Sequence, residues 1–298
     1  MRVFVTGASG WIGSATVTEL LGNGHTVVGL ARSDSSAAAL EAQGAEVLRG
    51  DLDDLAGLRT GADDAEAVVH LANKHDFANP VVSNKAERDA VETIAEALVG
   101  SDRPLLIASG AASLASGRPA TEDDASPAHG PDSMRGGSEN LVLSYAERGV
   151  RAGSVRFAPT VHGAGDHGFI SVLVEAAREQ GVARYVDEGQ KRWGAVHRSD
   201  AARLVRLGLE QAEPGAVLHA FGETGVPTRD IAEAIGRGLG VPVESVPAAE
   251  AADRLGWIAM FFGMDMAASS ERTRQRLEWT PTGPTLLEDL AGPAYFQR

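Results

Sequence analysis

Short apolar runs alternate with segments of helical period through the first half of the chain. Each run has the length of a strand, and the segments between them, such as 84–99 and 139–148, place apolar residues on one side of a helix. Such alternation is typical of an α/β fold, a doubly wound parallel sheet with helices on both faces. The runs fall at residues 3–5, 27–30, 46–48, 67–71, 105–108 and 153–155.

The second half of the chain is less regular. Helical spacing and short strand-like runs still alternate there, and a Pro-flanked stretch at 241–247 is predicted to be a link before more helix. The predicted helices lie at 169–180, 200–211 and 228–239, and the predicted strands at 184–186 and 217–221.

Three glycines, Gly7, Gly10 and Gly13, stand between the first strand and the first helix. Glycine allows positive φ and close approach of the backbone to a ligand, while the first amides and the positive dipole end of the helix attract phosphate. Glycine-rich loops also occur in ordinary tight turns. Here the loop follows a strand and opens a helix that ends near Gly22, and this context predicts a dinucleotide site.

Composition excludes several kinds of chemistry. The absence of cysteine excludes disulfides, thiolate catalysis and Cys-ligated zinc. A formal net charge of −14 argues against nucleic acid and anionic membranes, and we expect a soluble, cytoplasmic protein because no apolar run is long enough to span a membrane. His162, Asp166 and His167 are the nearest approach to a metal-ligand set, and we expect no metal site.

The order of motifs along the chain resembles that of the extended short-chain dehydrogenase/reductase superfamily. The resemblance covers the whole chain and implies a Rossmann-type NAD(P)-binding domain at 1–160, rejoined by 190–221, with a smaller substrate lobe formed by 161–189 and 222–298. The motifs that carry it are Thr6-Gly7-Ala8-Ser9-Gly10-Trp11-Ile12-Gly13, Gly50-Asp51-Leu52, His70-Leu71-Ala72, Arg156-Phe157-Ala158-Pro159 and Ala195-Val196-His197-Arg198-Ser199-Asp200.

The same resemblance suggests a role for two further segments. Residues 109–132 form a long stretch rich in Ser, Ala, Gly and Pro, which the family places beside the nicotinamide; a surface insert is the alternative. The helix at 84–99 pairs subunits in many members of the superfamily, so a homodimer is compatible with the sequence.

The end of the second strand bears on the choice of cofactor. Ala31 stands where the family often has an acid that holds the ribose hydroxyls, and Arg32 with Ser33 can bind a 2′-phosphate. We therefore expect NADP rather than NAD, although Asp34 could still reach a ribose. Asp51 resembles the residue that meets the adenine, or else caps the next helix.

The residues predicted to contact the cofactor come from the glycine turn and from the carboxyl ends of several strands. They are Gly7, Ser9, Gly10, Trp11, Ile12, Gly13, Arg32, Ser33, Asp51, Leu52, Leu71, Ala72, Asn73, Arg135, Pro159 and Val161.

The proton donor usual in the resembled superfamily is missing. Its Tyr-x-x-x-Lys pair falls on Pro131 and Arg135, and its serine falls near Ala111, so the chain resembles an atypical branch without the pair. Histidine near its ordinary pKa can act as acid or base, and arginine can bind an oxyanion or a ribose hydroxyl. The predicted catalytic residues are Arg135, His75, His129, His162, Ser109 and Ser113.

The function predicted from these features is an NADP(H)-dependent oxidoreductase that acts on a small to medium carbonyl or alcohol with a non-Tyr proton donor. Two alternatives remain open: a non-redox dehydratase, cyclase or isomerase, and an NADP(H)-binding sensor without turnover. A group of apolar residues in the second half either lines a substrate pocket or fills the core, namely Trp193, Trp257, Phe261, Phe262 and Met264.

Overall fold

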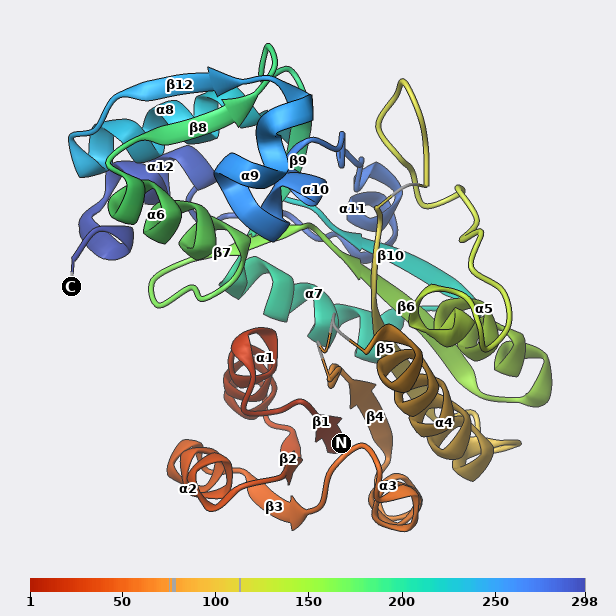
Figure 1. The fold of residues 1–298 in the computed structure, drawn as a ribbon. Coiled ribbons are helices and arrows are strands. Elements are labelled where there is room, and N and C mark those ends of the chain that lie inside the picture. The colour runs from red at the N-terminus through yellow and green to blue at the C-terminus, as the bar shows by residue number, and fades with distance from the viewer. Residues whose placement is uncertain (75, 77–78, 113, 298) are drawn as a thin grey trace.

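A seven-strand parallel sheet forms the centre of the computed structural model (Figure 1), which describes residues 1–74, 76, 79–112 and 114–297. The strands run in the order β10-β6-β5-β4-β1-β2-β3, and every neighbouring pair is parallel. They are β1 (Arg2–Thr6), β2 (Thr26–Ala31), β3 (Glu46–Arg49), β4 (Ala67–His70), β5 (Pro104–Gly110), β6 (Arg151–Phe157) and β10 (Ala216–Ala220).

Helices cover both faces of this sheet, as the alternation of side chains along the strands requires. Val3 and Val5 of β1 belong to the apolar cluster under one set of helices, whereas Phe4 between them belongs to the cluster under the other. The first set is α1 (Trp11–Gly22), α2 (Asp34–Gln43) and α7 (Arg198–Gln211), and the second is α3 (Leu55–Asp63), α4 (Pro80–Leu98) and α5 (Ser138–Ser144). The predicted doubly wound α/β architecture is confirmed.

A smaller lobe lies above the carboxyl ends of the central strands (Figure 1). Its core includes the buried side chains of Trp193 and Phe262, while Phe261 and Met264 pack against that core from partly buried positions. Its elements are α6 (Phe169–Gln180), β8 (Ala183–Val186), α8 (Thr228–Leu239), β12 (Val243–Val246), α9 (Ala251–Leu255), α10 (Ala259–Phe262) and α12 (Leu286–Ala291).

A second sheet connects the lobe to the central one. Its strands β7 (Thr160–His162), β9 (Arg192–His197) and β11 (Glu223–Pro227) run in the order β11-β9-β7. The remaining helix, α11 (Glu271–Leu277), packs beside α7 and β10. Short 3-10 turns lie at Met134–Gly137, Tyr145–Arg148, Ala248–Glu250, Gly256–Ile258 and Pro293–Tyr295.

Two segments differ from the sequence prediction. The stretch 241–247, predicted to be a link, contains strand β12, which pairs in parallel with β8. Residues after β5, which the resemblance places beside the nicotinamide, reach α11 in their middle part, where the Glu122 carboxylate accepts hydrogen bonds from the backbone and hydroxyl of Thr273 at 2.9 and 2.7 Å. A backbone bridge between Ala120 and Ala268 fixes this route.

A buried ion pair joins α5 to β6 beneath the sheet surface. Arg156 is 1% exposed and Glu139 is 6% exposed, and the Arg156 Nε atom donates to Glu139 Oε2 at 3.0 Å. Ser154 donates to the same oxygen at 2.9 Å. Burial raises the pKa of Glu139, but Arg156, Ser109 and Ser154 outweigh it and hold this pKa below its ordinary value.

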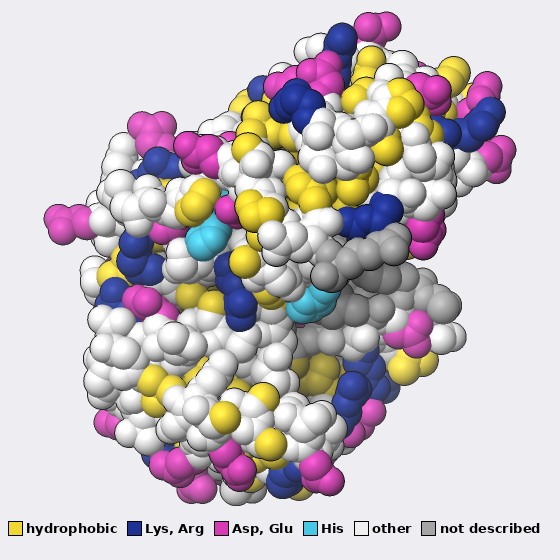
Figure 2. Space-filling view, turned by 90° about the vertical axis from the view of Figure 1, so that its left-hand side faces the viewer, with side chains coloured by type: hydrophobic (Ala, Val, Ile, Leu, Met, Phe, Trp, Pro, Cys, Tyr) yellow, Lys and Arg dark blue, Asp and Glu magenta, His cyan; other side chains and the backbone are white. Residues whose placement is uncertain are grey.

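The charge distribution on the surface and the length of the helices concern the binding of nucleic acid and membranes. On the face shown in Figure 2, basic side chains are interspersed with acidic ones rather than gathered in one patch. Among the described residues, no helix combines the length and apolar character that crossing a membrane demands.

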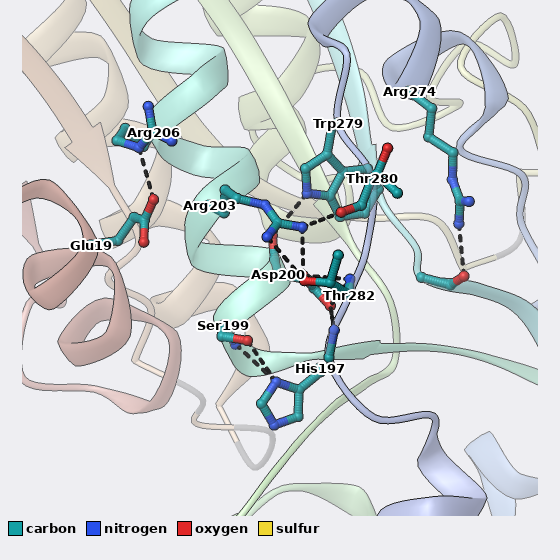
Figure 3. Close-up of polar contacts among 12 residues, drawn as sticks. Glu19, His197, Ser199, Asp200, Arg203, Arg206, Arg274, Trp279, Thr280 and Thr282 are labelled. Atoms are coloured by element: carbon teal, nitrogen blue, oxygen red, sulfur yellow. Dashed lines mark hydrogen bonds and ion pairs between the residues drawn. The ribbon is translucent and has the colours of Figure 1, made fainter. Parts of the chain in front are cut away.

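Asp200, in the first turn of α7, holds the end of the chain against the central domain (Figure 3). Its side chain is 1% exposed, and its Oδ2 atom accepts hydrogen bonds from the backbone N–H groups of Gly283 and Thr282 at 2.8 and 3.1 Å. Arg203 donates to its Oδ1 atom at 2.7 Å, and the Trp279 indole donates to its backbone carbonyl at 3.1 Å. The carboxylate and the backbone carbonyl of Asp200 together fix residues 279–283 on α7.

The buried ion pair predicts a large loss of stability in Glu139→Ala. The change leaves the Arg156 guanidinium buried without its carboxylate, which costs about 3 kcal/mol or more of unfolding free energy. Urea unfolding measures the loss. The control is Glu41→Ala, an exposed glutamate on α2, which we expect to change stability by less than about 0.5 kcal/mol. Equal, small losses in both variants would show that the pair adds nothing.

Candidate active site

A cleft of about 1080 Å³ opens between the carboxyl ends of the central strands and the smaller lobe. Ligands of doubly wound sheets bind at this edge, because helix N-termini and loops converge there. The cleft is lined by the glycine turn, the ends of β2 and β3, residues 71–74 after β4, residues 157–161 between β6 and β7, and residues 166–170 before and within α6. Its volume is at the upper end of the range of ligand sites.

The glycine turn forms the floor of the cleft through close backbone contacts. Gly7 has a φ of +66°, and a Cβ atom there would lie 2.7 Å from the Ala72 nitrogen. A Cβ atom on Gly13 would lie 2.0 Å from the Gly7 carbonyl oxygen. A side chain at Gly13 would therefore displace α1 from the turn after β1, and one at Gly7 would displace that turn from the segment after β4. The site is built for a ligand that approaches backbone amides, as a pyrophosphate does.

Trp11 links the glycine turn to the loop that follows β6. Its indole donates to the Val161 carbonyl at 2.7 Å, and the Arg198 guanidinium lies 4.1 Å from its ring centroid. The His167 ring packs edge to face against the Trp11 ring, with the two ring centroids 5.5 Å apart. The first turn of α1 is thereby fixed to the wall of the cleft on the lobe side.

The end of β2 presents one guanidinium and two hydroxyls to the cleft. Arg32, Ser33 and Ser36 line it, and the Ser33 side chain caps α2 by accepting from the Ser36 N–H at 3.2 Å. Asp34, the acid that could have held a ribose, does not line the cleft. Its fully exposed carboxylate lies 2.9 Å from the Arg49 guanidinium at the surface.

The acids that follow β3 are engaged in local contacts. Asp51 lines the cleft while its Oδ1 atom accepts from the N–H groups of Asp53 and Asp54 at 2.9 and 3.2 Å, which stabilises the turn before α3. Asp53 pairs with Lys74 at 2.7 Å across the cleft edge. Asp54 is the residue that caps α3.

Every residue predicted to contact the cofactor lines this cleft except Arg135. The Arg135 side chain lies behind the cleft wall, where its Nε atom donates to Glu87 Oε1 at 2.8 Å. Glu87 is 1% exposed and also accepts from the Asn73 amide, which does line the cleft. Within the part of the chain that the structure describes, Glu87 and Asn73 connect Arg135 to the cleft lining.

The other described residues predicted to be catalytic also lie outside the cleft lining. His162 is buried, with Nδ1 at 2.6 Å from Asp289 Oδ2, and burial lowers the pKa of His162. His129 is exposed in the loop before α5. Ser109 donates a hydrogen bond to Glu139, which helps to lower the pKa of that carboxyl group. His75 and Ser113 lie outside the described residues.

The tyrosines do not fill the empty catalytic position in the part of the chain that the structure describes. Tyr145 donates to Glu96 at 2.7 Å, and burial with this hydrogen bond raises its pKa to about 12. Tyr185 lies under Arg229, 5.6 Å from its guanidinium. Tyr295 donates to Asp166 Oδ2 at 2.9 Å and is the one that comes nearest to the cleft, through that carboxylate.

Asp166 was considered from the sequence only as a possible metal ligand and is not among the predicted catalytic residues. It lines the cleft together with His167, and its Oδ1 atom accepts from the Gly168 N–H at 2.6 Å. Burial raises the pKa of Asp166, and the hydrogen bonds from Gly168 and Tyr295 oppose the rise without cancelling it. The position of this acid in the glycine-rich loop just after β7 was the available signal.

Another buried histidine lies close to the cleft wall. His70 ends β4, and its Nδ1 atom is 2.9 Å from the Thr6 hydroxyl. Burial and, less strongly, the charge of Arg135 lower the pKa of His70 to about 3, so its ring is neutral near pH 7. As for metals, the described residues hold no group of three or more His, Asp or Glu side chains placed to bind one.

Together, the doubly wound sheet and the glycine turn beneath the cleft define an NAD(P)-dependent enzyme of the short-chain dehydrogenase/reductase type. The chain belongs to the NAD dependent epimerase/dehydratase family, whose model matches residues 3–221. The match spans all seven strands of the central sheet and ends just after β10.

Three curated relatives extend the comparison. An uncharacterized protein of Schizosaccharomyces pombe is 44% identical over 99% of this chain and all of its own length. A 4-hydroxy-2-methyl-3-oxo-4-farnesyl-3,4-dihydroquinoline-1-oxide ketoreductase of Stigmatella aurantiaca is 28% identical over 86% of this chain and 80% of its own. A 2'-dehydrokanamycin reductase of Streptomyces kanamyceticus is 29% identical over 100% of this chain and 81% of its own length.

Solved structures share the fold over nearly the whole chain. DesIV, a dTDP-glucose 4,6-dehydratase from Streptomyces venezuelae solved with NAD and TYD bound, superposes with a TM-score of 0.78 at 21% identity, covering 98% of this chain and 95% of its own. MoeE5 in complex with UDP-glucuronic acid and NAD superposes with a TM-score of 0.73 at 25% identity, covering 98% of this chain and 97% of its own.

The glycine contacts predict that Gly13→Ala abolishes cofactor binding. The added Cβ would lie 2.0 Å from the Gly7 carbonyl oxygen and would push α1 away from the turn. We expect no NADPH fluorescence enhancement on titration and a lower melting temperature. Gly22→Ala is the matched control at the other end of α1, because a Cβ there meets nothing within 4 Å. Unchanged binding in Gly13→Ala would contradict a pyrophosphate site at this turn.

Proposed function

We propose that the protein is an NADPH-dependent reductase of a small to medium carbonyl compound, with a proton donor other than tyrosine. The observation that carries the cofactor choice is the cationic and hydroxylic end of the cleft at Arg32, Ser33 and Ser36. The reductive direction draws support from the two bacterial relatives named as a ketoreductase and a reductase. When bound, NADPH supplies the hydride.

The end of β2 suits a 2′-phosphate better than a pair of ribose hydroxyls. The Arg32 guanidinium is exposed to the cleft and can make charge-assisted hydrogen bonds to phosphate. The Ser33 and Ser36 hydroxyls, 3.0 Å apart, lie at the N-terminus of α2, whose dipole favours an anion. With Asp34 paired to Arg49, no carboxylate of this loop opposes the phosphate.

The proton donor that we propose is Asp166. A carboxyl group whose pKa is raised by burial keeps its proton to higher pH, and a positioned acid of this kind can protonate a developing alkoxide. Asp166 lines the cleft on the lobe side, and Tyr295 together with the Gly168 N–H fixes its carboxyl group. Tyr295 acts through Asp166 and is a positioning residue.

The proposed phosphate site predicts cofactor discrimination. Arg32→Ala removes a charge-assisted hydrogen bond, so the Kd for NADPH should rise about 10- to 100-fold while the Kd for NADH stays the same. Fluorescence titration with both cofactors measures this. Arg59→Ala, which removes an exposed arginine of α3 outside the cleft lining, serves as the control. Equal losses for NADPH and NADH, or none, would overturn the choice of NADP.

The proposed donor predicts a pH-dependent loss of turnover. Asp166→Asn should lower kcat about 100-fold or more with NADPH binding unchanged, because the amide has no acidic proton. In the native enzyme the acid form donates, so kcat should fall as pH rises through the raised pKa of Asp166. Tyr295→Phe removes a hydrogen bond that lowers this pKa, so the falling limb should move to higher pH.

Two outcomes would redirect this proposal. If Asp166→Asn keeps full kcat while His167→Gln loses it, the proton comes from the neighbouring histidine. If NADPH binds tightly but no aldehyde or ketone consumes it, the protein is a sensor or a non-redox enzyme rather than a reductase.

A further inference from the structure

The lobe side of the cleft is apolar and aromatic, in contrast to its phosphate-binding end. Phe169, the first residue of α6, lies 5.8 Å from the Trp257 ring and 5.1 Å from that of Phe261. Trp257 lines the cleft and remains 53% exposed. In Figure 2 hydrophobic side chains gather on the face of the upper lobe. The lobe-side lining also includes Ile170 and Val172.

Cations are confined to the opposite side of the cleft. Among the described residues that line it, arginine and lysine occur as Arg32, at the end of β2, and Lys74, which is paired with Asp53 at 2.7 Å. On the lobe side the ionisable side chains that line the cleft are those of Asp166 and His167. A substrate phosphate or diphosphate placed here would meet no arginine or lysine of the lobe, and desolvating such an anion without a cation is costly.

We infer that the substrate is an uncharged carbonyl compound with an aromatic or cyclic apolar body, which packs against Phe169 and Trp257, and that it is not a nucleotide-sugar. This inference rests on the proposed reductase function for the carbonyl group. The aromatic or cyclic apolar part of the substrate is inferred from the side chains on the lobe side of the cleft alone. Aromatic faces bind flat apolar rings through burial and offset or edge-to-face contacts. Phe169 supplies a rigid face because Trp193, buried in the lobe core, packs behind it at 5.5 Å.

Binding to the protein loaded with NADP⁺ tests this inference without requiring turnover. The probes are 4-phenyl-2-butanone, an uncharged aryl ketone, and UDP-glucose, measured by isothermal titration calorimetry. We expect the aryl ketone to bind and UDP-glucose to show no binding at about 1 mM. Trp257→Ala should weaken the aryl ketone about tenfold, and Trp257→Phe should restore most of that loss.

Met260→Ala is the matched control for Trp257→Ala. Met260 is an apolar side chain of the neighbouring α10, 66% exposed, that does not line the cleft. Met260→Ala should leave the affinity for the aryl ketone unchanged. Tighter binding of UDP-glucose than of the aryl ketone, no binding of the aryl ketone, or an equal effect of the two alanine variants would each overturn the inference.

A parallel assay separates this inference from the proposed function. Loss of NADPH absorbance with 4-phenyl-2-butanone reports reduction, and calorimetry reports the binding of the apolar body. Binding that depends on Trp257, with no NADPH consumed by any carbonyl compound, would support the apolar site and refute the reductase. NADPH consumption together with ketone binding that does not depend on Trp257 would support the reductase and refute the apolar site.

Discussion

The contact between Gly7 and Gly13 is the constraint on which the site depends. Because neither residue carries a Cβ, the first turn of α1 lies directly against the turn that follows β1, and the same turn packs against the backbone of Ala72 after β4. Trp11 and Arg198 then fix this helix start to the β7 segment and to α7. The close backbone contacts of the glycine turn, with the side chains of Trp11 and Arg198, therefore hold together the parts of the chain that line the cleft.

Local patterns were sufficient to predict the sheet and the glycine turn that lines the cleft. A buried strand followed by glycines and a helix is encoded within thirteen residues, and Arg32 and Ser33 follow the next strand directly. Such features depend on neighbours in the sequence, so periodicity and turn chemistry report them. For the same reason the helices at 169–180 and 228–239 were predicted with the bounds that the structure has.

The catalytic residues were harder to predict because their environment comes from distant parts of the chain. Burial and Asp289, more than a hundred residues away, determine what His162 does, and Glu87 on α4 holds Arg135. The loop after β5 follows a path set by Thr273 and Ala268. No local pattern contains these partners. The raised pKa of Asp166 is likewise a product of burial by the lobe and cannot be inferred from a glycine-rich stretch alone.

Asp200 places a limit on how this architecture can be divided. The family match ends at residue 221, yet the carboxylate of Asp200 is satisfied by Thr282 and Gly283, far beyond that boundary. A lobe transplanted from a relative at residue 221 satisfies this buried acid only if its backbone N–H groups follow the same path against α7. Recombination between relatives, in evolution or in engineering, would therefore have to keep α7 and residues 279–283 matched to each other, even though residues 212–278 separate them in the sequence.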